Sequence, residues 1–118
     1  MDFKTQIKLL GERVTSLKSQ VNTEEATKNA FIMPFIKELG YDPFNPTEVT
    51  PELVADIGLK KGEKIDYAIL QNGEPIILIE CKHHTGSLNV ENASQLFRYF
   101  HTTKAKFSIL TNGIEYRF

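Results

Sequence analysis

The 118-residue sequence predicts a single α/β domain, in which helical and strand-like segments follow one another along the chain. Apolar residues recur every three or four positions over residues 3–39, a spacing typical of amphipathic helices. Two apolar segments, 64–70 and 75–82, then flank Asn72-Gly73, and such an arrangement predicts an antiparallel β-hairpin. A further helical pattern and two strand-like segments follow this hairpin.

The composition is that of an ordinary globular protein, with 41% hydrophobic and 25% charged residues. No apolar segment approaches the ~20 residues that a membrane-spanning helix needs, and the polar N-terminus is unlike a signal peptide. The single cysteine excludes an internal disulfide and fits the reducing cytoplasm. We therefore expect a cytoplasmic protein that has no membrane partner.

The formal net charge is −1. A protein that binds DNA by itself usually carries an excess of basic residues, which neutralise phosphates. Any affinity of this chain for DNA therefore has to come from local patches, from oligomerisation or from further parts of a larger assembly.

Residues 1–21 predict an amphipathic helix, because apolar residues alternate at spacings of four and three, the a/d pattern of a heptad. These residues are Phe3, Ile7, Leu10, Val14, Leu17 and Val21. Fewer than three heptads are short for an independent coiled coil, so we expect the helix to lie on the rest of the domain. Pairing with a second copy or with a partner subunit is the alternative.

A second helical region is predicted for residues 22–39. Asn22 has the character of an N-cap, and Glu25, three residues later, completes a capping-box pattern. Pro34 predicts a kink or the start of a second segment, and Gly40 is typical of the position after a helix C-terminus.

Residues 42–51 are rich in proline and predict a loop, followed by a short edge strand near residues 48–57. The next turn contains Lys60, Lys61 and Lys64 but lacks the spacing of a phosphate-binding loop. We interpret it as a solvated lysine turn, with contact to nucleic-acid phosphates as the alternative.

The hairpin carries charged residues on otherwise apolar strands. Asp66 lies on the first strand, and Glu80 and Lys82 on the second. Because strand side chains alternate between faces, Glu80 and Lys82 point the same way and Cys81 points the other way. Buried charges are costly unless they are paired or bind a metal. The pattern therefore predicts an acidic, metal-binding pocket at one end of the hairpin.

The turn imposes a condition on this pocket. A strict two-residue turn at Asn72-Gly73 places Asp66 and Glu80 on opposite faces of the sheet, where they cannot share a metal ion. A metal site therefore requires a loop with an odd number of residues, or a β-bulge that shifts the register.

The segment after the hairpin begins with His83 and His84, which we interpret as loop residues. Residues 89–103 predict a helix, on which Gln95 and Tyr99 are four apart and share a face. We expect these two side chains together to line the site beside Lys82, although Tyr99 taken alone is more typical of a core aromatic. Residues 104–110 and 114–118 predict the last strands.

Asp66 followed by Glu80-Cys81-Lys82 resembles the PD-(D/E)xK nuclease superfamily, with Ile65 where the superfamily name has proline. Gln95 and Tyr99 resemble the Q-x-x-x-Y element of one branch. The wider sequence is similar to the N-terminal nuclease domain of type I restriction enzyme R subunits over about residues 22–118. The matching segments are Leu39-Gly40-Tyr41, Glu63-Lys64-Ile65-Asp66-Tyr67, Ile79-Glu80-Cys81-Lys82 and Leu110-Thr111-Asn112-Gly113.

This resemblance implies a restriction-endonuclease-like mixed sheet flanked by helices, and hydrolysis of DNA with Mg²⁺ or Mn²⁺. The metal ligands it implies are Asp66, Glu80 and the backbone carbonyl of Cys81, with Lys82, Gln95 and Tyr99 as further catalytic residues. An acid on the helix of residues 22–39 would complete the metal site. Counting back from Pro34 favours Glu24 over Glu25, but the spacing alone does not separate them.

Two further interpretations stay open. A nuclease fold without turnover, used for nucleic-acid binding or protein assembly, is the alternative function. The sequence ends in mid-strand at Phe118, from which we expect that residues 22–118 are a nuclease domain cut from a longer chain.

Overall fold

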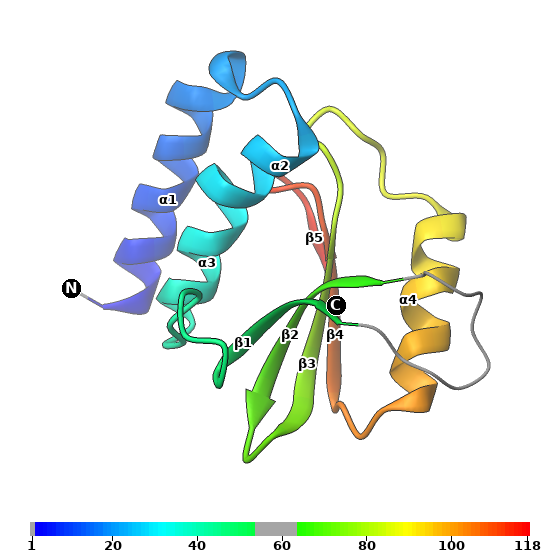
Figure 1. Ribbon diagram of the computed structural model, residues 1–118. Coiled ribbons are helices and arrows are strands. Elements are labelled where there is room, and N and C mark those ends of the chain that lie inside the picture. The colour runs from blue at the N-terminus through cyan, green and yellow to red at the C-terminus, as the bar shows by residue number, and fades with distance from the viewer. Residues whose placement is uncertain (1, 54–63) are drawn as a thin grey trace.

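The computed structural model of the chain describes residues 2–53 and 64–118, and only the backbone of residues 90–92, 95, 99 and 102. Five strands form one sheet in the order β1-β2-β3-β4-β5 (Figure 1). Neighbouring strands are antiparallel except β3 and β4, which are parallel. The strands are β1 (Val49–Leu53), β2 (Ile65–Gln71), β3 (Glu74–Cys81), β4 (Phe107–Thr111) and β5 (Tyr116–Arg117).

Helices cover both faces of this sheet (Figure 1). One layer contains α1 (Phe3–Leu17), the 3₁₀ turn η1 (Lys18–Gln20), α2 (Glu24–Thr27), the π-helical turn η2 (Lys28–Ile32) and α3 (Met33–Glu38). The opposite face is covered by α4 (Val90–Thr102), which connects the parallel strands β3 and β4. The predicted α/β fold, a mixed sheet flanked by helices with an additional N-terminal helix, is confirmed.

The apolar seam of α1 faces the domain. Val14 is buried, and Ile7 and Leu10 pack against the core between the helices and the sheet. Phe3, at the start of the seam, stays 55% exposed. The helix therefore docks along most of its length, while pairing through it with another chain stays a prediction.

The second helical region differs from the sequence prediction at its start. Thr23, not Asn22, is the N-cap, and its hydroxyl oxygen accepts a hydrogen bond from the Ala26 backbone N–H at 3.0 Å. The predicted capping box is therefore wrong, because three residues after Thr23 comes Ala26, which has no carboxylate to return the bond. Glu25 is instead directed to Lys28.

Pro34 divides this region as predicted, since α3 begins one residue before it. Proline has no N–H, so the carbonyl of Ala30, four residues earlier, loses its usual helical partner. Arg13 of α1 donates its Nε–H to that carbonyl at 3.4 Å. The π-helical turn that precedes the proline is thereby tied to the N-terminal helix.

The hairpin contains the β-bulge that a metal site requires. Near the turn, Leu70 lies opposite Pro75, but further along the strands Ile69 lies opposite Ile77. Ile76 is therefore the extra residue, and the register shifts by one. The carbonyl of Ile76 accepts a hydrogen bond from Lys106 at 3.0 Å, so the bulged backbone still has a partner.

The turn between β4 and β5 contacts both the loop after β3 and the helical layer. The side-chain oxygen of Asn112 accepts hydrogen bonds from the backbone of Ile114 and Glu115, and its amide donates to the Gly86 carbonyl at 2.8 Å. Gly113 has φ +85°, and a Cβ added there would lie 3.0 Å from the Phe31 ring. Only glycine fits this position without strain.

We expect Gly113→Ala to lower the free energy of unfolding by about 1–3 kcal/mol, because it adds backbone strain and a clash with Phe31. Gly11→Ala is the matched control, since nothing lies within 4 Å of a Cβ at that helical position. This control should raise the free energy of unfolding by about 0.5–1 kcal/mol. Urea unfolding followed by circular dichroism measures both, and equal effects of the two substitutions would contradict the role of Gly113.

Candidate active site

The bulge at Ile76 brings the two predicted carboxylates together. Tyr67 lies opposite Ile79, so one residue further along each strand Asp66 lies opposite Glu80. Their side chains share the face of Ala68 and Leu78, which pack against α4. Glu80 is only 4% exposed, and its carboxyl hydrogen-bonds that of Asp66.

Both oxygens of the Asp66 carboxyl have partners. Oδ2 accepts a hydrogen bond from the Cys81 backbone N–H at 2.8 Å. Oδ1 lies 3.3 Å from the ammonium nitrogen of Lys28. The Cys81 thiol points to the opposite face, as predicted, into the core beneath α3, where burial raises its pKa.

Lys28 joins this pocket from the opposite helical layer. It opens η2, and its side chain is only 10% exposed. Its ammonium contacts Glu25 at 2.5 Å and Asp66 at 3.3 Å. Burial works against the charged form, but hydrogen bonds and charge attraction from the two carboxylates outweigh it, so the pKa of Lys28 is raised. The lysine is therefore a buried cation in an acidic pocket.

Glu80 is held in its neutral form by its surroundings. Burial is the largest cause, followed by the hydrogen bond and charge of Asp66, and together they raise the pKa of Glu80 to about 9. The positive charge of Lys82 acts in the opposite direction and lowers the pKa. Two adjacent carboxyls with one proton between them are typical of a site that receives a cation or works as an acid–base pair.

Lys82 follows β3, and its backbone N–H donates to the Thr111 carbonyl on β4 at 2.9 Å. The next residues fasten the loop to the helical layer. His84 donates its backbone N–H to the Thr27 hydroxyl at 3.3 Å, and its ring Nε2 lies 2.7 Å from the Val21 carbonyl. The histidines therefore lie in the loop, as predicted, and His84 connects it to α2 and η1.

The two candidate acids of α2 lie differently. Glu25 reaches the pocket through Lys28, which bridges it to Asp66. Glu24 is exposed in the first turn of the helix, and its negative charge contributes to the raised pKa of Cys81. The structure thus connects Glu25 to the carboxylate pair, and a metal role for Glu24 stays a prediction.

Several predicted site residues fall outside what the structure describes. The backbones of Gln95 and Tyr99 belong to α4, but their side chains lie outside the described residues. Lys60 and Lys61 also lie outside them. Lys64 is described: it is exposed, and its ammonium lies 3.5 Å from Glu52, with both side chains in contact with solvent.

The donor atoms suit a hard divalent cation. Mg²⁺ is usually held by one or two carboxylates and keeps several waters, and Asp66 and Glu80 supply two adjacent carboxylates. Within residues 2–53 and 64–118, no group of three or more His, Cys, Asp or Glu side chains has the geometry of a metal cluster.

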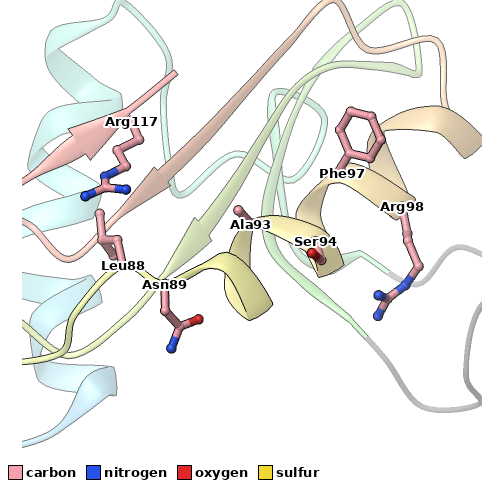
Figure 2. A pocket seen from close by; sticks show the side chains of 7 residues that line it. All are labelled: Leu88, Asn89, Ala93, Ser94, Phe97, Arg98 and Arg117. Atoms are coloured by element: carbon pink, nitrogen blue, oxygen red, sulfur yellow. The ribbon is translucent and has the colours of Figure 1, made fainter.

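A separate cavity of about 570 Å³ lies between the start of α4 and β5 (Figure 2). It is lined by Leu88, Asn89, Ala93, Ser94, Phe97, Arg98 and Arg117. Asp66, Glu80 and Lys82 do not line it, and none of its described lining residues carries a carboxylate. It is distinct from the acidic pocket.

The sequence analysis missed Lys28. Its signal was the i,i+3 spacing from Glu25, which on a helix surface predicts an ion pair. That spacing gives no hint that the ammonium also reaches Asp66, which lies 38 residues later in the chain.

Comparison with known proteins identifies a protein family. A family model described as the type I restriction enzyme R protein N terminus matches residues 23–118. No curated protein and no solved structure matches the chain. None of the described helices is long and apolar enough to cross a membrane.

The raised pKa of Glu80 predicts a pH-dependent stability of the metal-free protein. Below the ordinary carboxyl pKa of 4.5, Glu80 is protonated in both the folded and the unfolded chain. As the pH rises towards the folded-state value, only the unfolded chain releases the proton, so stability falls. Glu80→Gln does not titrate, and it should exceed the wild type by about 1–3 kcal/mol at pH 8.

Thermal or urea unfolding in the presence of a chelator, between pH 5 and 9, measures this difference. Glu12→Gln, at an exposed position on α1, is the control and should follow the wild-type profile. Identical profiles for Glu80→Gln and the wild type would contradict the described environment of Glu80.

Proposed function

Because the chain belongs to the family of type I restriction enzyme R protein N termini, we propose that it is a restriction-system nuclease domain. It hydrolyses phosphodiester bonds of DNA and depends on Mg²⁺ or Mn²⁺. The observation that supports this most is the pair of carboxyls, Asp66 and Glu80, which the bulge at Ile76 brings to one face of the sheet beside Lys82.

The residues that would hold the metal are Asp66, Glu80 and the backbone carbonyl of Cys81, with Glu24 or Glu25 as a further acid. When bound, the ion supplies a water of lowered pKa and offsets negative charge on the phosphate. Glu80 would hold the ion in its charged form, so this side chain would have to release its proton first.

Lys82 is the residue that we propose orients the attacking water and stabilises charge on the phosphate. The positive charge of Lys82 lowers the pKa of Glu80. The Lys82 ammonium is therefore close enough to act electrostatically on the carboxyl pair. Gln95 and Tyr99 are proposed to position the water or the phosphate from α4. The two residues are four apart and therefore lie on the same face of the helix, which supports this role.

DNA is the proposed partner, and the near-neutral charge of the chain requires that its contacts be local. Lys60, Lys61 and Lys64 are candidates for contacts to phosphates. Lys64 is paired with Glu52 at the surface, and an exposed pair of this kind is weak enough to be exchanged for a phosphate. A partner subunit or a second copy that docks through α1 is proposed as the route to assembly, and the cytoplasm as the location.

A catalytically inactive module for nucleic-acid binding or assembly is the second candidate. The observation that favours it is Lys28, which already supplies the acidic pocket with a positive charge. In such a module the lysine would be a permanent partner of Asp66, and no divalent ion would be needed.

Supercoiled and single-stranded DNA, incubated with the protein and Mg²⁺ or Mn²⁺, separate the two functions. We expect the wild type to cut at least one substrate, and Glu80→Gln to lose at least about 100-fold in rate. Because this variant should be the more stable protein at pH 8, its lost activity cannot come from unfolding. The surface variant Glu12→Gln should retain wild-type activity.

If wild type and Glu80→Gln leave both substrates equally intact, and calorimetry detects no divalent binding, the enzymatic function is rejected. The inactive module then remains as the function of the domain.

A further inference from the structure

We propose that Lys28 is an exchangeable internal cation: it neutralises the acidic pocket in the metal-free protein, and a divalent ion binds by displacing its ammonium from Asp66 towards Glu25. The inference rests on the proposed function, since it concerns the ion that this function requires. It assigns to Lys28 control over how readily that ion is bound.

The contacts of Lys28 place its charge where a metal would compete for it. The Oδ2 oxygen of Asp66 already accepts the Cys81 N–H at 2.8 Å. Oδ1 lies 3.3 Å from the ammonium, so a metal that binds this oxygen competes directly with Lys28. The ammonium and an ion on Oδ1 would therefore approach the same atom, and two cations so close repel each other strongly.

The two ion pairs of Lys28 are unequal. The contact with Asp66, at 3.3 Å, is longer than the roughly 2.7–2.9 Å of a strong charge-assisted hydrogen bond. The contact with Glu25 is 2.5 Å. A divalent ion thus has the longer of the two contacts to break, while the shorter one can hold the lysine after it leaves Asp66.

The solvent exposure of Glu25 and Asp66 indicates the direction in which the Lys28 ammonium can move. The side chain of Glu25 is 75% exposed, whereas those of Lys28 and Asp66 are 10% and 19% exposed. Of the two partners of Lys28, Glu25 is therefore the one that faces solvent. A lysine that moves towards Glu25 keeps an opposite charge beside it and gains water.

The backbone around Lys28 is held firmly, so the exchange is confined to the side chain. The preceding residue, Thr27, is fully buried; its hydroxyl donates to the Thr23 carbonyl at 3.1 Å and accepts from His84 at 3.3 Å. The Lys28 carbonyl itself accepts the Met33 N–H that closes the π-helical turn. The flexible four-carbon side chain is free to move while this frame stays fixed.

Amine labelling of the wild-type protein tests the displacement directly. Acetylation with an activated ester, read out residue by residue by peptide mass spectrometry, reports how accessible each ammonium is. Without divalent ions we expect Lys28 to react slowly, and with saturating Mg²⁺ to react several-fold faster. Lys37, exposed on α3, is the internal control and should react at one rate in both conditions.

Calorimetry with Mg²⁺ alone provides a second readout that does not depend on activity. Lys28→Met keeps the length of the side chain and removes its charge. It should bind Mg²⁺ at least about tenfold more tightly than the wild type, the factor that corresponds to removing about 1.4 kcal/mol of repulsion. Lys37→Met should bind with wild-type affinity. If Lys28→Met fails to fold, the labelling of the wild type still decides.

The outcomes separate this inference from the proposed function. If the wild type binds Mg²⁺ but the labelling of Lys28 does not change and Lys28→Met binds no more tightly, the exchange is wrong and the metal site stands. If Mg²⁺ binds only after Lys28→Met, the lysine is a permanent partner of Asp66 in the wild type, and the exchange is wrong. If neither protein binds Mg²⁺ or Mn²⁺, the exchange and the metal-dependent nuclease are both rejected.

Discussion

The register of the β2–β3 hairpin is the constraint on which the candidate site depends. The Asn72-Gly73 turn by itself would place Asp66 and Glu80 on opposite faces of the sheet, because side chains alternate with every residue. One additional residue, Ile76, shifts the register and brings both carboxyls to the face of α4. The bulge is stabilised by the parallel neighbour, since Lys106, just before β4, donates to the Ile76 carbonyl.

The carboxylate pair that results is unfavourable for folding and has to be compensated. Glu80 is almost fully buried, and burial raises its pKa, while the Asp66 carboxyl lies beside Lys28 and accepts the Cys81 N–H. Removing a desolvated ion from its only partners costs several kcal/mol in typical proteins.

Two loops, the one after β3 and the turn between β4 and β5, hold the helical layer and the sheet together near these carboxyls. His84 reaches Thr27 and Val21 from the end of β3, and Asn112 reaches the Gly86 carbonyl from the β4–β5 turn. Gly113 lets that turn approach Phe31 closely enough to close the core. The Leu110-Thr111-Asn112-Gly113 segment, which resembles the restriction-enzyme family in sequence, therefore supports the geometry of the site without belonging to its chemistry.

The sequence by itself determined the elements of the fold and the identity of the central acids. Periodicity, the Asn72-Gly73 turn and strand alternation sufficed for the helices, the hairpin and the opposed directions of Glu80 and Cys81, because each of these depends on neighbours a few residues apart. The spacing of Asp66 and Glu80 around the turn also predicted that a metal site requires an odd loop or a β-bulge. The sequence could not place that bulge at Ile76, since this position depends on pairing with a strand some 30 residues later in the chain.

Tertiary structure alone decided which cation joins the acids. Lys28 is an ordinary helical lysine in sequence, three residues after Glu25, and only the packing of η2 against the end of the sheet brings it to Asp66. The N-cap of α2 also depended on the course of the backbone in the folded chain, which makes Thr23 rather than Asn22 the capping residue. Local sequence patterns indicate which interactions a residue can make. Burial and long-range contacts determine which of these interactions form, because desolvation changes the free energy of a charged group far more than any local preference does.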